Sequence, residues 1–140
     1  MEALEKAIEL AARAHAGQVD KAGEPYILHP LRVVMKMETN TERIVAVLHD
    51  TYEDTWLTEQ HLLAAGFDDE AIFKALDSVT KREGETYMEF IQRAKENSIG
   101  RKVKLADLRD NLDIKRIKNP TEQDYKRLDR YNKALVELIE

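Results

Sequence analysis

Apolar side chains recur every three or four positions along almost the whole chain, and this spacing constrains the fold more than any other feature. In the first segment Leu4, Ile8 and Ala11 share one face, as in an amphipathic helix. No segment alternates apolar and polar residues beside turn residues, as a half-buried strand would. Only five glycines and three prolines interrupt the 140 residues. The sequence therefore predicts an all-α fold, a single compact helical bundle that forms one domain over residues 1–140.

Glycines, prolines and capping residues divide the chain into the expected helices. Gly17 is placed to end the first helix, and Pro30 to lie in the first turn of the second. Asn40 or Thr41 is expected to cap the third. The remaining helices are expected from about residue 58, from about residue 68, and over residues 86–97, 100–117 and 122–139. The face of the last helix that is expected to close the core comprises Tyr125, Leu128, Tyr131, Leu135 and Leu138.

Composition excludes several classes of function. The absence of cysteine rules out disulfides, thiolate catalysis and cysteine-based zinc sites, so any metal must bind His, Asp or Glu. The net charge of −5 argues against a nucleic-acid polymer as partner, although a small anionic substrate remains open. There is no apolar run of membrane-spanning length, and the first residues lack the layout of a signal peptide. We therefore expect a cytoplasmic protein without a membrane partner.

The segment from His49 to Asp54 is the most informative part of the chain. It continues an apolar helical run, yet it contains His49, Asp50, Glu53 and Asp54. If the helix continues, these four side chains share one face, where the three carboxylates would repel one another and resist burial. A bound divalent cation would remove this repulsion. The alternative is a solvated helix end where acidic residues cluster by chance, and the segment alone leaves both interpretations open.

Two isolated residues could extend such a site. His29 stands at the expected start of the second helix, where a histidine can cap or pack as well as bind a metal. Asp107 lies within a charged helical segment, where an aspartate is normally solvated. Because both residues are far from His49 in the sequence, spacing alone does not connect them with it.

Five segments, taken in order, resemble the HD-domain superfamily of metal-dependent phosphohydrolases. More narrowly, they resemble the hydrolase domain of the RelA/SpoT alarmone enzymes of the stringent response and their small stand-alone relatives, the metazoan SpoT homologues among them. The segments are Ala14–Gln18, Gly23–Pro30, Leu48–Thr55, Val79–Lys81 and Lys104–Asn111. The resemblance implies an all-helical HD fold and an enzyme that removes the 3′-pyrophosphate from guanosine tetra- or pentaphosphate, usually with manganese.

The resemblance also assigns roles to residues. The implied metal ligands are His29, His49, Asp50 and Asp107. Glu53 and Asp54 match the acidic pair that, in the family, lies beside a metal-activated water and manages protons during attack on the 3′-phosphoester. Which of the two is the acid and which the base is left open.

The chain departs from the family where the nucleoside is recognised. Asp20 stands where these hydrolases usually have an arginine that stacks on guanine, and Leu108 follows Asp107 where they usually have a cation. Lys21 and Asn111 remain as expected substrate-binding residues. Since a carboxylate has no planar cationic face, we expect base preference to be relaxed or altered while phosphoester hydrolysis is retained.

Two alternatives stay beside the main prediction of a guanosine-3′,5′-bis(diphosphate) 3′-pyrophosphohydrolase. One is hydrolysis of another nucleotide phosphate, such as an adenosine alarmone or NADPH. The other is a nucleotide-sensing module without turnover, against which the acidic pair argues. In each case the partner is a small nucleotide, and the oligomeric state is left open.

Overall fold

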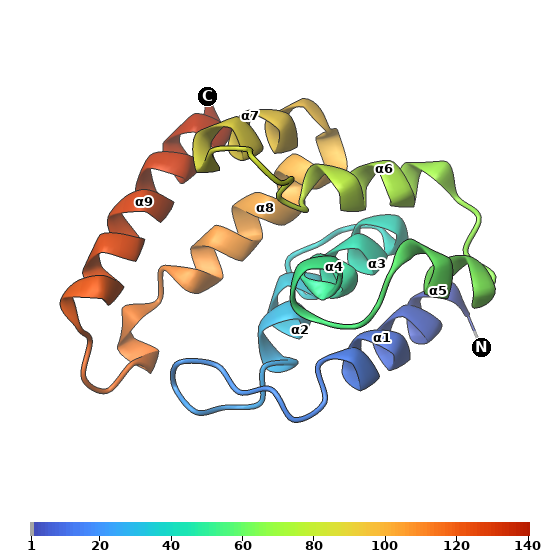
Figure 1. Cartoon of the computed structure of the whole chain (residues 1–140), viewed down its shortest axis with the longest axis horizontal. Coiled ribbons are helices and arrows are strands. Elements are labelled where there is room, and N and C mark those ends of the chain that lie inside the picture. The colour runs from blue at the N-terminus through green and yellow to red at the C-terminus, as the bar shows by residue number, and fades with distance from the viewer. Residues whose placement is uncertain (1) are drawn as a thin grey trace.

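The computed structural model describes residues 2–140, and Figure 1 shows helices joined by loops over this part of the chain. The helices are α1 Ala3–Ala14, α2 Leu28–Val34, α3 Asn40–Leu48, α4 Thr51–Asp54, α5 Glu59–Ala64, α6 Glu70–Ser78, α7 Tyr87–Glu96, α8 Ser98–Asn111 and α9 Glu122–Ile139, with the short 3₁₀ turn η1 Ile114–Arg116 between the last two. Among the described residues, β-structure is limited to one isolated bridge between Val19 and Pro25. The predicted all-α fold is confirmed.

Side-chain caps fix where several helices begin. Reciprocal capping boxes, which satisfy amide groups of the first turn, are formed by Thr39, Thr86 and Thr121. The cap of α3 is thus Thr39, one residue before the predicted Asn40. Asp69 caps α6, because its carboxylate accepts the amide of Ala71, so the helix expected from about residue 68 begins at Glu70.

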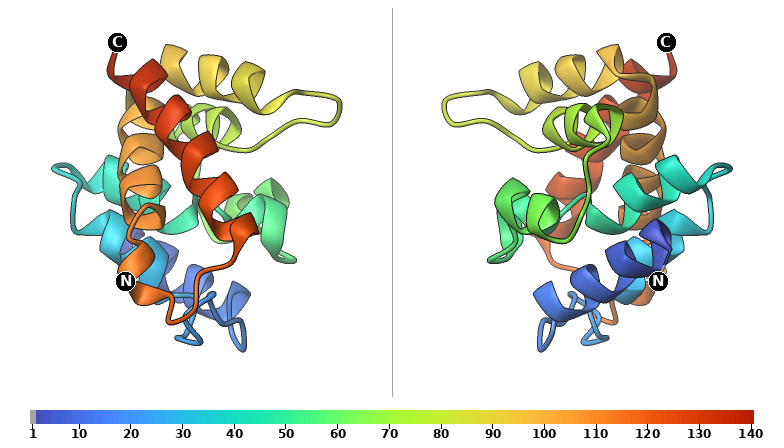
Figure 2. Two further views of the ribbon diagram at one scale, coloured as in Figure 1. Left: turned by 90° about the vertical axis from the view of Figure 1, so that its left-hand side faces the viewer. Right: turned by 90° about the vertical axis from the view of Figure 1, so that its right-hand side faces the viewer.

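Helix α8 lies between two groups of helices (Figures 1 and 2). On one side it contacts α2, α3 and α6, and on the other α7 and α9. A Cβ on Gly100 would lie 1.9 Å from the Oγ of Ser78, so glycine permits the close approach of α8 to α6. Val103 of α8 belongs to the larger core cluster, formed with α1, α2, α3 and α6. Leu108 belongs to the smaller one, with Ile91, Ala134 and Leu138.

Helix α8 ends earlier than predicted. Its helical run stops at Asn111 and not near Ile117, and the chain turns into η1. The Nη2 of Arg116 donates to the main-chain oxygen of Asp110 over 2.6 Å. The same carbonyl accepts the amide of Asp113 over 3.3 Å, and the bond from Arg116 brings that side chain back over the end of α8.

Helix α9 covers the smaller core cluster with only part of its predicted face. Leu138 is buried, and Tyr131 and Leu135 pack against the cluster, but Tyr125 is 57% exposed. The prediction that Tyr125 closes the core is therefore wrong, because α9 meets α7 and α8 mainly along its C-terminal half. Within residues 2–140, none of the helices combines the length and the apolarity that crossing a membrane requires.

Candidate metal centre

A sharp corner between α3 and α4 presents two of the predicted ligands. The Oγ1 of Thr51 donates to the carbonyl of Leu48 over 2.7 Å, and the Nδ1 of His49 lies 2.6 Å from the carbonyl of Ala46. These side chains satisfy carbonyls at the end of α3, so the helix stops and α4 starts in a new direction. The shared helix face depends on a helix that continues through Asp54, and this condition is not met, because α3 ends at Leu48 and α4 begins at Thr51. His49 is buried at the corner, whereas Glu53, one turn later, is exposed.

The fold brings together four residues from three parts of the chain. His29 comes from α2, His49 and Asp50 from the corner, and Asp107 from α8. One ligand atom from each of the four lies within 4.8 Å of the others. The Nε2 atoms of His29 and His49 lie 2.8 and 3.2 Å from Oδ1 of Asp107, and the Nε2 of His49 lies 3.2 Å from Oδ2 of Asp50. This convergence supplies the connection that sequence spacing lacks.

The hydrogen bonds on the outer edges of the two imidazoles show that the cluster requires positive charge. The Nδ1 of His49 faces the Ala46 carbonyl, and the Nδ1 of His29 faces the Asp110 carboxylate over 2.6 Å. Because a carbonyl and a carboxylate only accept, each Nδ1 carries the hydrogen. In the neutral rings, the Nε2 lone pairs then point at carboxylate oxygens, which also have only lone pairs to offer. Positive charge, from protons on the rings or from a bound ion, is therefore needed between them, and two imidazoles with two carboxylates are ligands that suit a divalent ion.

Without a metal, protons supply the positive charge. Burial disfavours the charged form of His29, but its hydrogen bonds to Asp107 and Asp110 outweigh burial and raise its pKa. The pKa of His49 is likewise raised, because Asp50 and Asp107 outweigh its complete burial. Burial also opposes ionisation of Asp50, yet the adjacent His49 holds its pKa at about 2. Protons and a divalent ion therefore compete for one place.

Neighbouring side chains hold the two carboxylates in position. The hydroxyl of Tyr26 donates to Oδ2 of Asp50. The Nζ of Lys104 donates to Oδ2 of Asp107 over 2.8 Å, while the Nδ2 of Asn111 donates to its Oδ1 over 3.1 Å. Asn111, which the sequence assigns to the substrate, thus also contacts one of the predicted ligands.

The acidic pair that follows the corner is divided between two cavities. Asp54 lines the cavity that includes Asp50 and Asp107, and burial followed by repulsion from Asp50 raises its pKa. Glu53 lines an adjoining cavity of 430 Å³, where its Oε1 accepts the amide of Lys81. Partial desolvation of its carboxylate also raises the pKa of Glu53, against the effect of this bond. The sequence does not distinguish the two residues, whereas the structure does.

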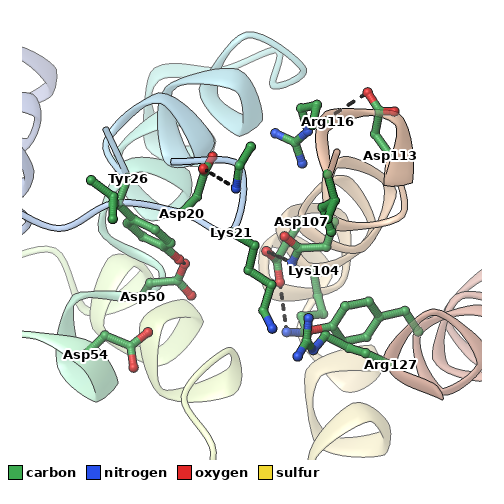
Figure 3. A pocket seen from close by; sticks show the side chains of 15 residues that line it. Asp20, Lys21, Tyr26, Asp50, Asp54, Lys104, Asp107, Asp113, Arg116 and Arg127 are labelled. Carbon is green, nitrogen blue, oxygen red and sulfur yellow. Dashed lines mark hydrogen bonds and ion pairs between the residues drawn. The ribbon is translucent and has the colours of Figure 1, made fainter. Parts of the chain in front are cut away.

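The cavity of 380 Å³ beside the cluster has two chemically different walls. Figure 3 shows Tyr26, Asp50 and Asp54 on one side, with Arg116 and Arg127 across from them. Sequence reasoning missed both arginines. The signal for Arg127 is its position four residues before Tyr131, which lines the same cavity and so lies on the same face of α9. Arg116 gave no such signal, because its position depends on the early end of α8.

The loop before α2 closes one end of this cavity with Asp20 and Lys21. The Nζ of Lys21 lies 3.6 Å from Oδ1 of Asp124 in α9. The Oδ1 of Asp20 accepts the amides of Ala22 and Glu24 over 2.8 and 3.0 Å. Asp20 therefore shapes its own loop, and Lys21 is the cation that the loop extends towards α9.

Comparison with known proteins gives homologues that are much longer than this chain. A guanosine-3′,5′-bis(diphosphate) 3′-pyrophosphohydrolase of Aquifex aeolicus is 34% identical over 123 residues, 79% of this chain and 17% of that protein. A probable GTP pyrophosphokinase of Mycobacterium leprae is 34% identical over 134 residues, 86% of this chain and 17% of that protein. The chain thus spans about a sixth of the length of these relatives. No protein-family model matches it.

A solved structure of similar size has the same fold. It is described as a metazoan orthologue of SpoT that hydrolyses ppGpp, and it matches with a TM-score of 0.81 at 22% identity. The match covers 100% of this chain and 86% of the other. The resemblance inferred from the five sequence segments is therefore confirmed: the chain is similar in sequence to part of these alarmone enzymes and in fold to the metazoan orthologue of SpoT.

Proposed function

We propose that this chain is a metal-dependent nucleotide phosphohydrolase that acts as a 3′-pyrophosphohydrolase on a guanosine-3′,5′-bis(diphosphate)-like substrate. One observation carries the proposal. The cluster of His29, His49, Asp50 and Asp107 includes residues that line a cavity whose opposite wall is cationic. Manganese as the ion, residence in the cytoplasm, a nucleotide as the only class of partner, and one domain over residues 1–140 are further parts of this proposal.

The divided chemistry of the cavity suits phosphoester hydrolysis. A divalent ion, when bound, polarises a phosphate oxygen and lowers the pKa of a water molecule. Across the cavity, Lys21 and Arg127 are placed to hold phosphate groups through charge-assisted hydrogen bonds. Asp54 lies on the ligand side with a raised pKa, so its carboxylate is suited to hold a proton beside the reacting phosphate.

Glu53 has a different part in the proposal. Its carboxylate accepts the amide of Lys81, which lines the adjoining cavity together with Arg130. Lys104 and Asn111 line both cavities, so a substrate with two separated phosphate groups can extend from one into the other. We propose that Glu53 orients the Lys81 loop for this second group and that Asp54 is the residue next to the chemistry.

Recognition of the base differs from recognition of the phosphate groups. Asp20 offers no planar cationic face, and its Oδ1 is occupied by two amides of its own loop. The Aquifex aeolicus relative is named for a guanosine substrate, which favours guanine as the base. The cavity itself supplies several cations that suit phosphate groups. We therefore propose that the phosphate arrangement is recognised more strictly than the ring, which keeps adenosine alarmones and NADPH as alternative substrates.

Release of pyrophosphate or phosphate from a nucleotide panel tests this function. The panel contains guanosine and adenosine 3′-pyrophosphates, NADPH and simple nucleotides, each with manganese and with a chelator. We expect manganese-dependent release of pyrophosphate from the 3′-pyrophosphates, and none from an Asp107→Asn variant. Binding of these nucleotides without turnover at any manganese concentration would instead support the nucleotide-sensing module.

A further inference from the structure

Asp110, in the last turn of α8, contacts a predicted metal ligand on the edge that faces away from the cluster. Its Oδ2 lies 2.6 Å from the Nδ1 of His29. The Nε2 of the same ring points towards Asp107 at 2.8 Å. The imidazole is thus held between an inner carboxylate, which belongs to the cluster, and an outer one, which does not.

The two histidines of the cluster meet the same requirement by different means. The Nδ1 hydrogen of His49 is accepted by the main-chain carbonyl of Ala46, so the course of the helix itself fixes that ring. The Nδ1 hydrogen of His29 is accepted by a side chain, Asp110. A carboxylate in this outer position fixes the ring orientation, keeps Nε2 free of hydrogen and increases its basicity as a ligand.

Two arginines hold Asp110 in place. The Nε of Arg32 donates to Oδ1 over 2.8 Å and its Nη2 to Oδ2 over 3.1 Å. The Nη1 of Arg116 lies 3.4 Å from Oδ2, while its Nη2 donates to the Asp110 main-chain oxygen over 2.6 Å. These contacts keep the carboxylate ionised and fixed, and they offset a negative charge that would otherwise add to the repulsion between Asp50 and Asp107.

We propose that Asp110 is a positioning residue of the metal centre: it holds His29 with Nε2 directed at the ion, and thereby increases the affinity of the centre for a divalent cation. Arg32 and Arg116 brace it in this position. The inference rests on the proposed function, since it needs a metal bound by His29 and His49.

Metal affinity and imidazole proton signals together test this inference. Manganese binding is measured by calorimetry for the parent and for Asp110→Ala, Asp110→Asn and Asp113→Ala. Asp113→Ala is the matched control, because it removes the same charge three residues further along the chain. The Asp113 carboxylate is half-exposed, and its Oδ2 lies 4.0 Å from the Nε of Arg116. Proton NMR of the zinc-loaded proteins then follows the Nδ1 hydrogens of the two histidines.

We expect Asp110→Ala to weaken manganese binding by ~10–100-fold, the usual effect of losing an outer partner of a metal-binding histidine. Asp110→Asn should weaken binding less, because an amide oxygen still accepts the hydrogen bond. In the zinc-loaded Asp110→Ala protein the His29 Nδ1 proton should be lost through exchange with water, while that of His49 persists. Asp113→Ala should leave both signals and the affinity unchanged.

The outcomes separate this inference from the proposed function. If the parent binds no ion at His29 and His49, the proposed centre is wrong and the role of Asp110 falls with it. If the parent binds the ion and both Asp110 variants bind it equally well, only the role of Asp110 is wrong. Should Asp110→Ala fail to fold, the Asp110→Asn protein decides, since unaltered affinity together with an unaltered His29 signal contradicts the proposal.

Discussion

The two walls of the main cavity differ in charge and in what holds them. The wall from the α3–α4 corner carries the carboxylates of Asp50 and Asp54, and the adjacent ligand His49 is only 2% exposed. Its helices pack into the larger apolar cluster. The wall from η1 and α9 is cationic, and its Arg116 and Arg127 side chains are 31% and 25% exposed. These arginines are held by ion pairs with Asp110 and Asp124.

This difference shows that one cavity can combine side chains that are held rigidly with side chains that are free to adjust. Metal ligands must be held within a fraction of an ångström, so they belong on elements fixed by a dense apolar core. Cations that receive phosphate groups can move, because charge attraction depends less steeply on position than coordination does. We therefore expect changes on the acidic wall to abolish function and changes on the cationic wall to weaken it.

The largest effect should come from removing a ligand on the acidic wall. We expect His49→Ala to weaken manganese binding by more than the ~100-fold that loss of an outer partner can cause, and to abolish turnover. The measurements are manganese titration and the rise of Tm on adding manganese. His61→Ala, which changes an exposed histidine of α5, is the matched control and should behave as the parent does. Equal stabilisation of the His49→Ala protein by manganese would show that the site is misplaced.

Changes in the acidic pair should have the second-largest effect, and Glu53 and Asp54 should affect different kinetic constants. Asp54→Ala is expected to lower kcat by at least ~10²-fold, as for a proton-handling residue, while manganese affinity stays close to that of the parent. Glu53→Ala should act mainly on KM, because its carboxylate holds the Lys81 loop. Steady-state kinetics at saturating manganese measures both. Loss of bound metal from the Asp54 variant would make Asp54 a ligand instead.

On the cationic wall we expect a smaller effect, confined to substrate binding. Arg127→Ala removes one charge-assisted contact and should raise KM by roughly tenfold with little change in manganese affinity. Lys126→Ala is the control, since that neighbouring cation is exposed and pairs with Glu122 on the outside of α9. If kcat and metal binding fell together in Arg127→Ala, the two walls would not act separately.

The smallest effect concerns an ion pair at the adjoining cavity, which Glu85 lines. Arg93 of α7 holds Glu85 through contacts of 2.8 and 2.9 Å, and this pairing lowers the pKa of Glu85 from 4.5 to about 2. Because the folded-state pKa is depressed, the contribution to stability is complete above pH 4.5 and is lost as the pH falls towards 2.

Glu85→Gln should therefore lower Tm by about 2 °C at neutral pH, and the difference from the parent should shrink below pH 4.5. Thermal melts over this pH range measure it. Glu83→Gln, an exposed change in the same loop, should have no such pH dependence. A difference that stays constant down to pH 2 would show that the pair does not stabilise the fold.

The sequence determined most of the fold and indicated the candidate ligands. Helical apolar spacing depends on neighbours three and four residues apart, so it can be read locally, and α9 has the predicted bounds. Boundaries that depend on one side chain were less accurate. Thr39, and not Asn40, caps α3. Helix α8 ends at Asn111 and not near Ile117, and Arg116 donates a hydrogen bond to a main-chain oxygen of its last turn. Both depend on hydrogen bonds that spacing does not reveal.

Tertiary structure alone decided which residues meet. The sequence gives no physical link between His29 and Asp107, which are joined by a contact across 78 positions; only the resemblance placed them in one site. It gave no sign of Asp110 behind His29 or of Arg116 across the cavity, because an acidic or basic residue in a polar segment looks the same whether it is solvated or paired. What distinguishes these residues is the partner that packing brings to them, and that partner comes from a different helix.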